Sequence, residues 1–502
     1  MSGNSRRVHK TVPESALWLG VLYFSGTTPH GGFFDPGGDE RCMDTPISFG
    51  TDGWRATLDE FTSPRVQIVG QAVADYLREV EDRAGETVAV SYDARETSRG
   101  FAEDLCRVLA ANGFDVLIPE RDTPTPILAW TLVDRDLAGG LMITASHNPP
   151  EYNGVKFIPS DGAPALPEVT DEIMARLAEP DPLPESEHGR VSEEDLVAPY
   201  ADHAFDLVDA DFEDLSVVYD AMHGSGRGVT DELLEEAGAS VECLRCERDP
   251  EFGGSSPEPS EENLQELVAA VEDGDADLGI ANDGDADRIA VVTPERGFLD
   301  ENLFFAALYE YLLEADSGSA IRTVSTTFLI DRIAEKHGEE VHETPVGFKW
   351  VAQAIADHDA LVGGEESGGF TIRGHIREKD GVLMALLAAA IAAERPFDDR
   401  VDDLLAEFGE IHQNKISLDC PDDEKERVLA DLEAELPDEV AGHDVADVVT
   451  KDGFKILLDD GSWLLVRPSG TEPAMRIYAE GESDDRVRDL LDAGTELVEP
   501  LI

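Results

Sequence analysis

The sequence predicts an α/β protein with largely parallel sheets that ends in a smaller α+β unit. From residue 44 onward, short apolar runs rich in β-branched residues alternate with amphipathic helical stretches. The chain has 502 residues, which at roughly 100–200 residues per domain predicts about three or four domains. Hydrophobic residues make up 41% of the chain, enough to bury a sizeable core and to exclude wholesale disorder.

The alternation is clearest near the start. We expect Val88–Tyr92 to form a strand, Gly100–Asn112 a helix and Asp115–Ile118 the next strand. Further strands are expected at Leu141–Thr144, Val217–Tyr219, Leu278–Ala281 and Ile289–Val292. The terminal unit should contain strands at Ile416–Leu418, Gly453–Leu458 and Trp463–Val466, and a helix with one acidic face at Glu424–Leu436.

Two other segments have a distinctive composition. Val382–Ala393 is apolar throughout, but it is shorter than the roughly 20 residues that span a membrane, so we expect a core helix. Glu179–Asp195 is polar, acidic and contains proline, which is typical of a linker.

The charge balance is extreme. The chain has 39 Lys and Arg against 108 Asp and Glu, a formal net charge of −69, and only nine of the basic residues are Lys. Such a chain is repelled by phosphodiester backbones and anionic lipids, so we expect neither a nucleic-acid nor a membrane partner. The acid is spread along the whole chain, which argues against an acidic interaction tail. Our hypothesis is a halophilic, cytoplasmic protein whose self-repulsion is screened by multimolar salt.

Five cysteines are too few for a disulfide framework. Cys243-Leu244-Arg245-Cys246 has redox or half-zinc spacing, but no second pair or histidine cluster completes a metal site. We therefore expect free, buried thiols.

Residues 1–43 differ from the rest of the chain. Ser5-Arg6-Arg7 followed by the apolar Ala16–Phe24 is similar to a twin-arginine export signal. The apolar run is short, Glu14 precedes it and no clear cleavage site follows. We favour a mis-assigned start or a disordered extension over an export signal.

Asp283-Gly284-Asp285-Ala286-Asp287-Arg288 lies between two expected strands. Carboxylates at i, i+2 and i+4 of an extended loop point to one side, and three hard oxygens suit Mg²⁺. An EF-hand is excluded because its sixth and twelfth positions are Arg288 and Pro294. A haloacid-dehalogenase-type motif does not fit Asp287. Chance clustering in so acidic a chain is the alternative, and the flanking strands and the glycine argue against it.

Thr144–Pro149 lies at the carboxyl end of an expected strand, where α/β proteins place ligands. Ser146 is a candidate nucleophile or phosphate carrier, and Lys156 follows in Asn153-Gly154-Val155-Lys156. A serine hydrolase is disfavoured because the Gly-x-Ser-x-Gly elbow is missing and the adjacent His147 is poorly placed as its base. Taken alone, this stretch could equally be a turn-rich connection.

Two glycine-containing stretches have polar groups suited to a sugar phosphate. Gly363–Gly369 places two carboxylates and a hydroxyl between glycines, which allows a polyhydroxylated ligand to approach closely. Arg467–Pro473 offers a guanidinium, hydroxyls and backbone N–H groups, a set that matches a phosphate dianion without being a Walker loop. Each alone could be an ordinary turn. His223–Gly228 could also hold a phosphate, but we favour a tight strand-to-helix turn.

Together and in this order, these loops resemble the α-D-phosphohexomutase superfamily, the phosphoglucomutase/phosphomannomutase group. The resemblance runs from about Phe49 to the C-terminus, and Phe49–Arg55 looks like that family's opening motif. It implies four domains around a central cleft, three with related mixed α/β sheets and a smaller C-terminal α+β domain. The implied boundaries are an extension at 1–43 and domains at 44–192, 193–296, 297–406 and 407–502.

The resemblance also implies roles for individual residues. Ser146 is the phosphorylated residue, and Ser146, Asp283, Asp285 and Asp287 are the Mg²⁺ ligands. The implied catalytic residues are Ser146, His147, Lys156, Arg55 and Arg288, with Lys156 or His147 as general base. The implied substrate-binding residues are Lys349, Glu365, Ser367, Lys379, Arg467, Ser469, Gly470 and Thr471.

The implied activity is reversible conversion of hexose 1-phosphate to hexose 6-phosphate through phospho-Ser146 and a hexose 1,6-bisphosphate. Mg²⁺ is the expected cofactor, glucose 1,6-bisphosphate the activator, and the protein a monomer or homodimer acting on sugar phosphates. Glu365-Glu366-Ser367 is most similar to the glucose-type loop, so a phosphoglucomutase is expected first, a phosphomannomutase or dual enzyme second and a phosphoglucosamine mutase third.

Three departures from the family pattern stand out. Trp54 replaces a smaller aliphatic residue, Gly369 stands where some dual-specificity members have His, and the N-terminal extension has no counterpart. Outside the family, two alternatives stay open: a Mg²⁺-dependent sugar phosphatase and a non-catalytic cation-binding protein.

Overall fold

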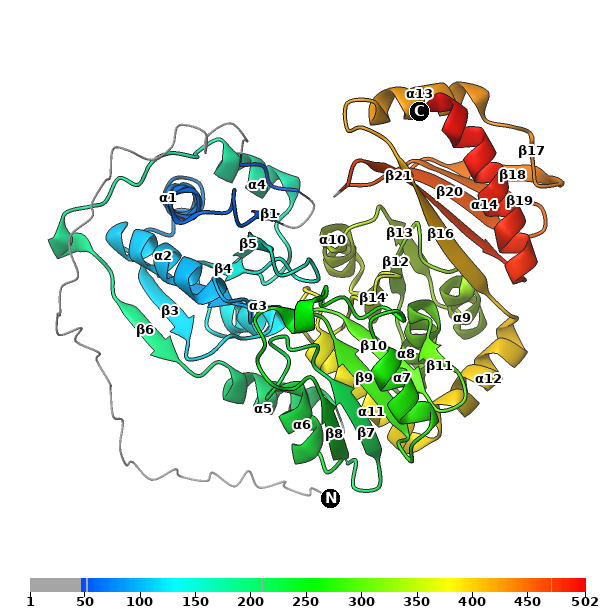
Figure 1. Cartoon of the computed structure of the whole chain (residues 1–502), viewed down its shortest axis with the longest axis horizontal. Coiled ribbons are helices and arrows are strands. Elements are labelled where there is room, and N and C mark those ends of the chain that lie inside the picture. Colours follow the sequence, from blue (N-terminus) through cyan, green and yellow to red (C-terminus); the bar gives the residue numbers. More distant parts are fainter. Residues whose placement is uncertain (1–46, 51–52, 209–210, 471) are drawn as a thin grey trace, which may run out of the picture. The chain divides into compact units, whose positions relative to one another are not determined.

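A computed structural model describes residues 47–50, 53–208, 211–470 and 472–502 of the chain (Figure 1). The expected extension at 1–43 and Thr471 lie outside the described residues. Residues 53–502 form four sheets, of which three are mixed and the last is antiparallel. The α/β fold class with a terminal α+β unit is therefore confirmed. Among the described residues, no helix is both long and apolar enough to cross a membrane.

The first sheet has the strand order β1-β5-β4-β2-β3-β6. Its strands are β1 (Trp54–Thr57), β2 (Thr87–Tyr92), β3 (Asp115–Pro119), β4 (Gly139–Ile143), β5 (Tyr152–Pro159) and β6 (Val191–Glu194). Its helices are α1 (Ser63–Glu79), α2 (Ser98–Ala111), α3 (Thr125–Asp134) and α4 (Pro167–Met174). Side chains alternate between two cores: Val88 and Val90 pack with α1 and α2, while Ala89 packs with α3.

The linker expected at Glu179–Asp195 is only partly a linker. It contains a short 3₁₀ turn, η2 (Glu185–Glu187), and β6, which pairs in parallel with β3 at the edge of the first sheet. All four residues of β6 are exposed. Because neither face of this strand is buried, it has no apolar alternation by which the sequence could have revealed it.

The second sheet has the order β11-β10-β9-β7-β8. Its elements are α5 (Val197–Leu207), β7 (Ser216–Asp220), α6 (Thr230–Glu236), β8 (Ser240–Leu244), η3 (Phe252–Gly254), α7 (Gln265–Glu272), β9 (Leu278–Asn282), β10 (Ile289–Thr293) and β11 (Gly297–Leu299). His223–Gly228 forms the expected turn between β7 and α6.

The third sheet has the order β13-β12-β14-β15. Its elements are α8 (Glu301–Ala315), β12 (Ala320–Thr323), α9 (Leu329–His337), β13 (Val341–Thr344), α10 (Phe348–His358), β14 (Val362–Gly364), β15 (Phe370–Ile372), α11 (Gly381–Glu394) and α12 (Phe397–Phe408). Helix α11 is buried from Gly381 to Ala392, so the core helix expected in this apolar run is confirmed.

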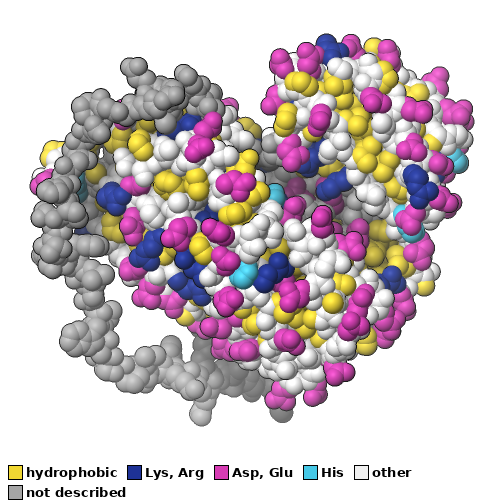
Figure 2. Space-filling view, viewed as in Figure 1, with side chains coloured by type: hydrophobic (Ala, Val, Ile, Leu, Met, Phe, Trp, Pro, Cys, Tyr) yellow, Lys and Arg dark blue, Asp and Glu magenta, His cyan; other side chains and the backbone are white. Residues whose placement is uncertain are grey.

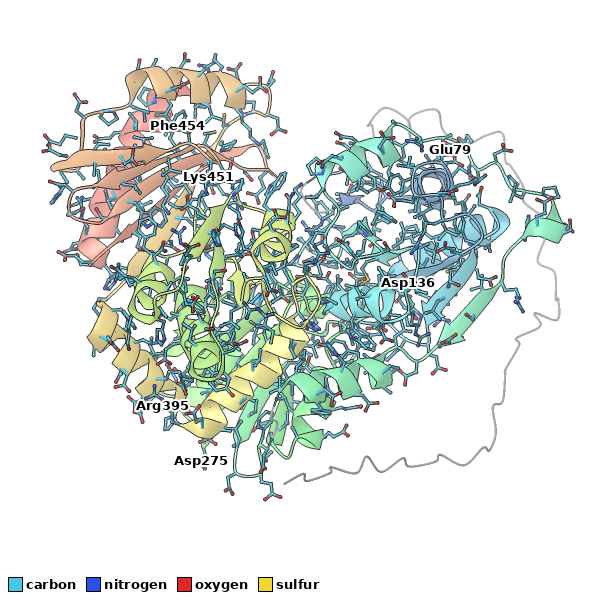
Figure 3. The ribbon with its side chains drawn as sticks, turned by 180° about the vertical axis from the view of Figure 1, so that it is seen from behind. Glu79, Asp136, Asp275, Arg395, Lys451 and Phe454 are labelled. Atoms are coloured by element: carbon cyan, nitrogen blue, oxygen red, sulfur yellow. The ribbon has the colours of Figure 1, made fainter. Side chains whose placement is uncertain are left out.

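The last sheet has the order β16-β21-β20-β19-β18-β17. Its elements are β16 (His412–Asp419), α13 (Lys425–Glu435), β17 (Glu439–Val440), β18 (His443–Val449), β19 (Phe454–Leu458), β20 (Trp463–Pro468), β21 (Ala474–Gly481), α14 (Asp484–Val498) and η4 (Glu499–Leu501). Lys451, in the turn between β18 and β19, donates to the Glu343 carbonyl of β13 at 2.6 Å (Figure 3). The ammonium of Lys455 lies 4.1 Å and 4.2 Å from the ring centroids of Phe328 and Trp463.

The first three sheets repeat one pattern. In each, three strands run parallel and a fourth returns antiparallel to the last of them, as in β3-β2-β4-β5, β8-β7-β9-β10 and β13-β12-β14-β15. The turns of the returning hairpins are residues 144–151, 283–288 and 365–369. These turns contain the expected phosphoserine, the expected Mg²⁺ ligands and the expected sugar-binding residues. The phosphate-type stretch lies at the β20–β21 hairpin of the fourth sheet.

Of the four described cysteines, Cys106 and Cys420 are buried, as expected for free thiols. The expectation of burial is wrong for the other two: Cys243 is exposed and Cys246 is half-buried. Both lie on or just after β8, which is the edge strand of its sheet and has little cover.

Candidate active site

The hairpin after β4 places Ser146 against the β9–β10 turn, residues 283–288, which we name the metal loop after its expected ligands. The Ser146 hydroxyl donates to Asp283 Oδ2 at 2.8 Å and lies 3.2 Å from His147 Nδ1. Ser146 is 1% exposed and has a φ of 50°, in the left-handed region that non-glycine residues rarely adopt. Its amide donates to Thr144 Oγ1 at 2.7 Å, which holds the loop in this conformation. Backbone strain of this kind is a common feature of functional sites.

Arg95 holds the backbone of this hairpin in place. Its guanidinium donates to four backbone carbonyls of the hairpin, those of Ser146, Asn148, Pro149 and Tyr152, at 2.7–3.2 Å. Asp93 pairs with Arg95 Nε at 3.0 Å and also accepts from the hydroxyls of Ser98 and Thr144. The position of Ser146 is therefore fixed by a buried ion pair that the sequence reasoning missed.

The three aspartates of the second hairpin are buried and converge. One carboxylate oxygen from each of Asp283, Asp285 and Asp287 lies within 4.8 Å of the others. Asp285 Oδ2 accepts from Thr125 Oγ1 at 2.6 Å, so the first domain helps to orient the cluster. Burial, followed by repulsion from Asp285 and Asp287, raises the pKa of Asp283.

The chemistry of this donor set fits a divalent cation. Asp285 Oδ1 and Asp287 Oδ1 are buried and have no hydrogen-bond partner, although buried carboxylate oxygens normally have one. Three buried carboxylates in one cluster also repel one another unless a cation neutralises them. Hard oxygen ligands of this kind suit Mg²⁺.

Two lysines already neutralise part of this charge. Lys156 Nζ lies 3.3 Å from Asp285 Oδ2 and 3.0 Å from Asp287 Oδ2, and Lys379 Nζ lies 3.2 Å from Asp287 Oδ2. Burial opposes the ionised form of Asp287, but Lys156 and Lys379 outweigh this effect and lower its pKa. Lys379, expected at the substrate, thus also borders the metal loop, where it contacts Glu378 as well.

A glycine allows the first two hairpins to touch. A Cβ on Gly284 would lie 2.7 Å from the Ser146 carbonyl oxygen, closer than real Cβ atoms approach backbone oxygen. Any other residue at 284 would therefore separate Ser146 from Asp283.

Basic residues surround His147 and Ser146. Arg55 donates to Asn148 Oδ1 at 3.0 Å, and Arg288 Nε lies 3.9 Å from Asp287 Oδ1. Burial, then the charges of Arg288 and Arg55, lower the pKa of His147 well below its usual value. The imidazole is therefore neutral at pH 7.

The third hairpin holds the expected sugar-binding residues. Glu365 is 7% exposed and accepts from the Gly347 amide at 2.8 Å, while burial and its neighbour Glu366 raise its pKa to about 7. Ser367 is half-buried on the same turn. Glu366 accepts from Ser325 Oγ at 2.7 Å, which directs it toward the end of β12.

Two further residues complete this region. Lys349 lies at the start of α10, and its ammonium is 5.8 Å from the Trp350 ring centroid. A Cβ on Gly369 would lie 2.4 Å from Lys379 Cδ, so the absence of a side chain at 369 leaves room for the Lys379 stem.

The fourth hairpin is held by ion pairs and a lysine. Arg467 Nε donates to Asp452 Oδ2 at 2.8 Å, and the same oxygen accepts from the Val346 amide at 3.1 Å. Lys425 Nζ donates to the carbonyls of Ser469 and Glu472 at 2.7 Å and 2.6 Å. Gly470 is exposed at the turn.

The structure thus brings one group of expected residues into direct contact: Ser146, His147, Lys156, Asp283, Asp285, Asp287, Arg288 and Lys379. Glu365 interacts electrostatically with Lys379 and Arg288. Arg467 is joined through Asp452 to the loop that precedes Lys349.

The missed residues are Asp93, Arg95 and Thr125. Asp93 directly follows the strand expected at Val88–Tyr92, so its place at a strand end could have revealed it. Thr125 is the first residue of α3, far in the sequence from Asp285, which it contacts, and no strand end marks it as a site residue.

Comparisons with known proteins show which family the chain matches. Sequence models of the phosphoglucomutase/phosphomannomutase family match in four parts: the alpha/beta/alpha domain I at residues 46–183, domain II at 198–297, domain III at 300–408 and the C-terminal domain at 416–496.

Curated relatives cover nearly the whole described chain. A probable phosphoglucosamine mutase of Methanopyrus kandleri is 36% identical over 90% of this chain and 97% of its own. A phosphoglucomutase/phosphomannomutase of Thermococcus kodakarensis is 33% identical over 90% and 98%. A protein of Thermus thermophilus, solved as a candidate phosphomannomutase, superposes with a TM-score of 0.80 at 32% identity, covering 91% of this chain and 100% of that one. With four matching domains in order, the chain belongs to the phosphoglucomutase/phosphomannomutase family of phosphohexomutase isomerases.

Proposed function

We propose that this enzyme interconverts hexose 1-phosphate and hexose 6-phosphate through phosphorylated Ser146. The observation that carries the proposal is the 2.8 Å contact between Ser146 Oγ and Asp283 Oδ2 inside a buried carboxylate cluster. It joins a nucleophilic hydroxyl to a set of oxygens suited to Mg²⁺, on two hairpins that glycine lets approach.

In the first half-reaction, the bond between phosphorus and Ser146 Oγ breaks and a bond from phosphorus to the free sugar hydroxyl forms. The hydroxyl proton passes to Lys156 or His147; His147 lies next to Ser146 Oγ, and Lys156 contacts Asp287 of the carboxylate cluster. The resulting bisphosphate then turns over, and its other phosphoryl group returns to Ser146. Ser146 and the three aspartates would hold Mg²⁺, whose positive charge would lower the barrier to transfer.

Other residues of this chain hold the substrate and stabilise charge. Arg55 and Arg288 would neutralise the equatorial oxygens of the transferring group. Glu365 and Ser367 hold ring hydroxyls, with Lys349 and Lys379 beside them. The loop of Arg467, Ser469, Gly470 and Thr471 binds the phosphate that is not transferred, since a guanidinium and turn amides suit a dianion.

For the sugar, we propose glucose first. Glu365-Glu366-Ser367 supports glucose, and mannose alone or together with glucose comes second. The Methanopyrus kandleri relative, named a probable phosphoglucosamine mutase, favours glucosamine as a further candidate. Glucose 1,6-bisphosphate is the proposed activator.

The test measures kcat/KM at high KCl with Mg²⁺ and a trace of glucose 1,6-bisphosphate, for the 1-phosphates of glucose, mannose and glucosamine side by side. We expect the highest value for glucose 1-phosphate. Equal values for glucose and mannose would mean a dual enzyme, and a dominant glucosamine value would overturn the glucose assignment. Release of inorganic phosphate without hexose 6-phosphate would indicate a phosphatase instead.

Ser146→Ala tests the covalent step. We expect loss of turnover and of radiolabel transfer from substrate to protein, with the thermal unfolding midpoint retained. Ser160→Ala, directly after β5 of the same hairpin, is the matched control and should leave both unchanged. Near-normal activity in Ser146→Ala would refute the phosphoserine scheme.

A further inference from the structure

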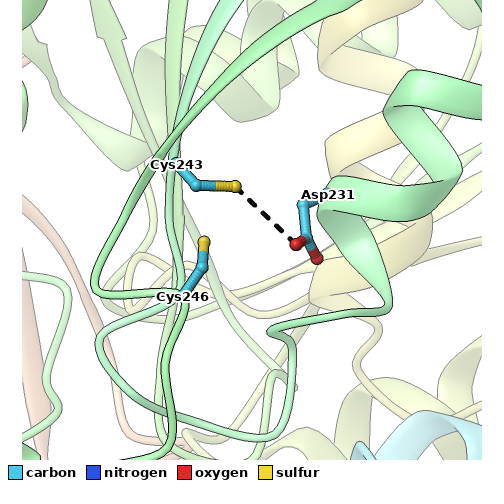
Figure 4. Close-up of side chains that lie close together, drawn as sticks. All are labelled: Asp231, Cys243 and Cys246. Carbon is cyan, nitrogen blue, oxygen red and sulfur yellow. Dashed lines mark hydrogen bonds between the residues drawn. The ribbon is translucent and has the colours of Figure 1, made fainter.

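A second cluster of metal-ligating side chains lies outside the candidate active site. It consists of Asp231 on α6 and of Cys243 and Cys246 on and just after β8, and the three side chains point toward one another (Figure 4). One ligand atom from each lies within 4.8 Å of the others, and Cys243 Sγ donates to Asp231 Oδ2 at 3.7 Å. The cluster is partly accessible, since Cys243 is exposed and the other two residues are half-buried.

The backbone turns the second cysteine back toward the first. Arg245, between the strand end and Cys246, has a φ of 48°, a left-handed conformation that reverses the chain. Its guanidinium is fixed by Asp220 at the end of β7, with Nε donating to Oδ1 at 2.9 Å. The pairing of the two sulfur atoms is thus set by a turn that an ion pair holds.

We propose that Asp231, Cys243 and Cys246 bind a zinc ion or a similar thiophilic divalent cation. Two thiolates separated by two residues, as in a Cys-x-x-Cys sequence, are a common half of a zinc site, and a carboxylate is an accepted third ligand. A fourth position is open to water or to Glu235, which lies one turn after Asp231 and acts electrostatically on Cys243. The soft sulfur donors select against Mg²⁺, so this site and the aspartate triad take different ions.

The position of the cluster suggests a structural role. Strand β8 is the edge of its sheet, where among the described strands it pairs with β7 alone, and it is largely exposed. An ion bound to both α6 and β8 would fasten this edge to the helix. The first residue of α6, Thr230, donates to Asn282 Oδ1 at 2.9 Å, and Asn282 immediately precedes Asp283. The ion would therefore stabilise α6, whose first residue contacts Asn282 beside the metal loop, without contacting substrate.

The experiment uses the full chain, reduced and freed of metal, with excess Mg²⁺ to fill the aspartate triad. Co²⁺ is the probe, because thiolate ligands give it an intense near-ultraviolet charge-transfer band that oxygen ligands do not. We expect the band to saturate at one Co²⁺ per chain and to be displaced by Zn²⁺. Absence of the band, or its persistence at full strength in Cys243→Ser, would overturn the proposal.

Matched variants separate this site from the other thiols. Cys420→Ala removes a buried thiol elsewhere and should keep the band, while Cys243→Ser and Cys246→Ser should abolish it. Asp231→Asn should weaken Co²⁺ binding at least tenfold, whereas Glu232→Gln, its exposed neighbour on α6, should not.

Stability gives an independent readout. Zn²⁺ should raise the unfolding midpoint of the parent and of Cys420→Ala but not of Cys243→Ser, with kcat at saturating Mg²⁺ unchanged in all three. A Cys243–Cys246 disulfide in the protein as purified, detected by a mass change on reduction and unaffected by Zn²⁺, would replace the metal site by a redox pair.

Discussion

At the residue scale, we expect Glu365 to give the proposed sugar-binding region a pH dependence. Burial and Glu366 raise its pKa to about 7, so at neutral pH the carboxyl is only half ionised. A carboxylate accepts hydrogen bonds from sugar hydroxyls, and a protonated carboxyl loses part of that capacity. We therefore expect kcat/KM to rise as pH increases through about 7 and then to level off.

Glu365→Gln is the control for this profile. Its side chain does not titrate, so kcat/KM should be lower and should lack the step near pH 7, while ionisation of the substrate phosphate remains in both proteins. The free energy of unfolding should change with pH in the opposite direction to kcat/KM. Because the folded pKa is raised, Glu365 contributes stability below its unfolded pKa of about 4.5, and this contribution is lost as pH rises through about 7. An identical step in kcat/KM near pH 7 in the parent and in Glu365→Gln would mean that another group titrates there.

Gly369 makes a second prediction at this scale. A methyl group there would lie 2.4 Å from Lys379 Cδ, so Gly369→Ala should displace Lys379 from Asp287 and reduce kcat/KM by roughly tenfold or more, about 1.4 kcal/mol. Lys379→Met should have a similar effect, and the double variant should be no worse than either, because both changes remove one interaction. Gly100→Ala, where a Cβ meets nothing within 4 Å, is the control. Additive losses in the double variant would contradict the coupling.

At the scale of elements, α13 supports the β20–β21 turn, the proposed phosphate-binding loop, through one side chain. Lys425 donates to two carbonyls of the β20–β21 turn, and charge-assisted hydrogen bonds of this kind contribute about 1.5–3 kcal/mol. Lys425→Met should raise KM for hexose phosphate about tenfold with a smaller effect on kcat. Arg427→Gln, on the exposed face of the same helix, should change neither. Unaltered KM in Lys425→Met would mean that the turn holds its shape without the lysine.

Elements also show what the sequence could and could not predict. Strands buried on both faces, such as β2, β9 and β10, were predicted within one residue at each end because continuous apolar runs mark them. The exposed edge strand β6 was missed for lack of such a run. In the site, residues within compact motifs were found, whereas Arg95 and Thr125 act through contacts to residues 51 or more positions away. Such long-range contacts follow from topology and leave no local pattern.

At the scale of the whole molecule, the formal net charge of −69 should make folding stability depend strongly on salt. Acidic side chains are scattered over the visible face rather than gathered in one patch, so repulsion acts throughout (Figure 2). The screening length is about 10 Å at 0.1 M salt and about 3 Å at 1 M. We expect the unfolding midpoint to fall steeply as KCl is lowered from molar to millimolar concentration.

This prediction is checked by thermal unfolding across a KCl series. Because screening does not depend on the identity of the ion, NaCl should protect about as well as KCl at equal ionic strength. Full stability in dilute buffer would sink the hypothesis of a halophilic protein, and protection by one salt alone would point to specific ion binding.

In the proposed function, one substrate contacts hairpins from four separate sheets, each with its own helices. A sugar phosphate that contacts all four hairpins therefore acts as a cross-link between parts of the chain that could otherwise melt independently. Calorimetry should then show overlapping transitions for the free enzyme that merge into one sharper transition with bisphosphate bound. Bound substrate would then contribute to the folding cooperativity of the whole enzyme, and its release would remove that contribution.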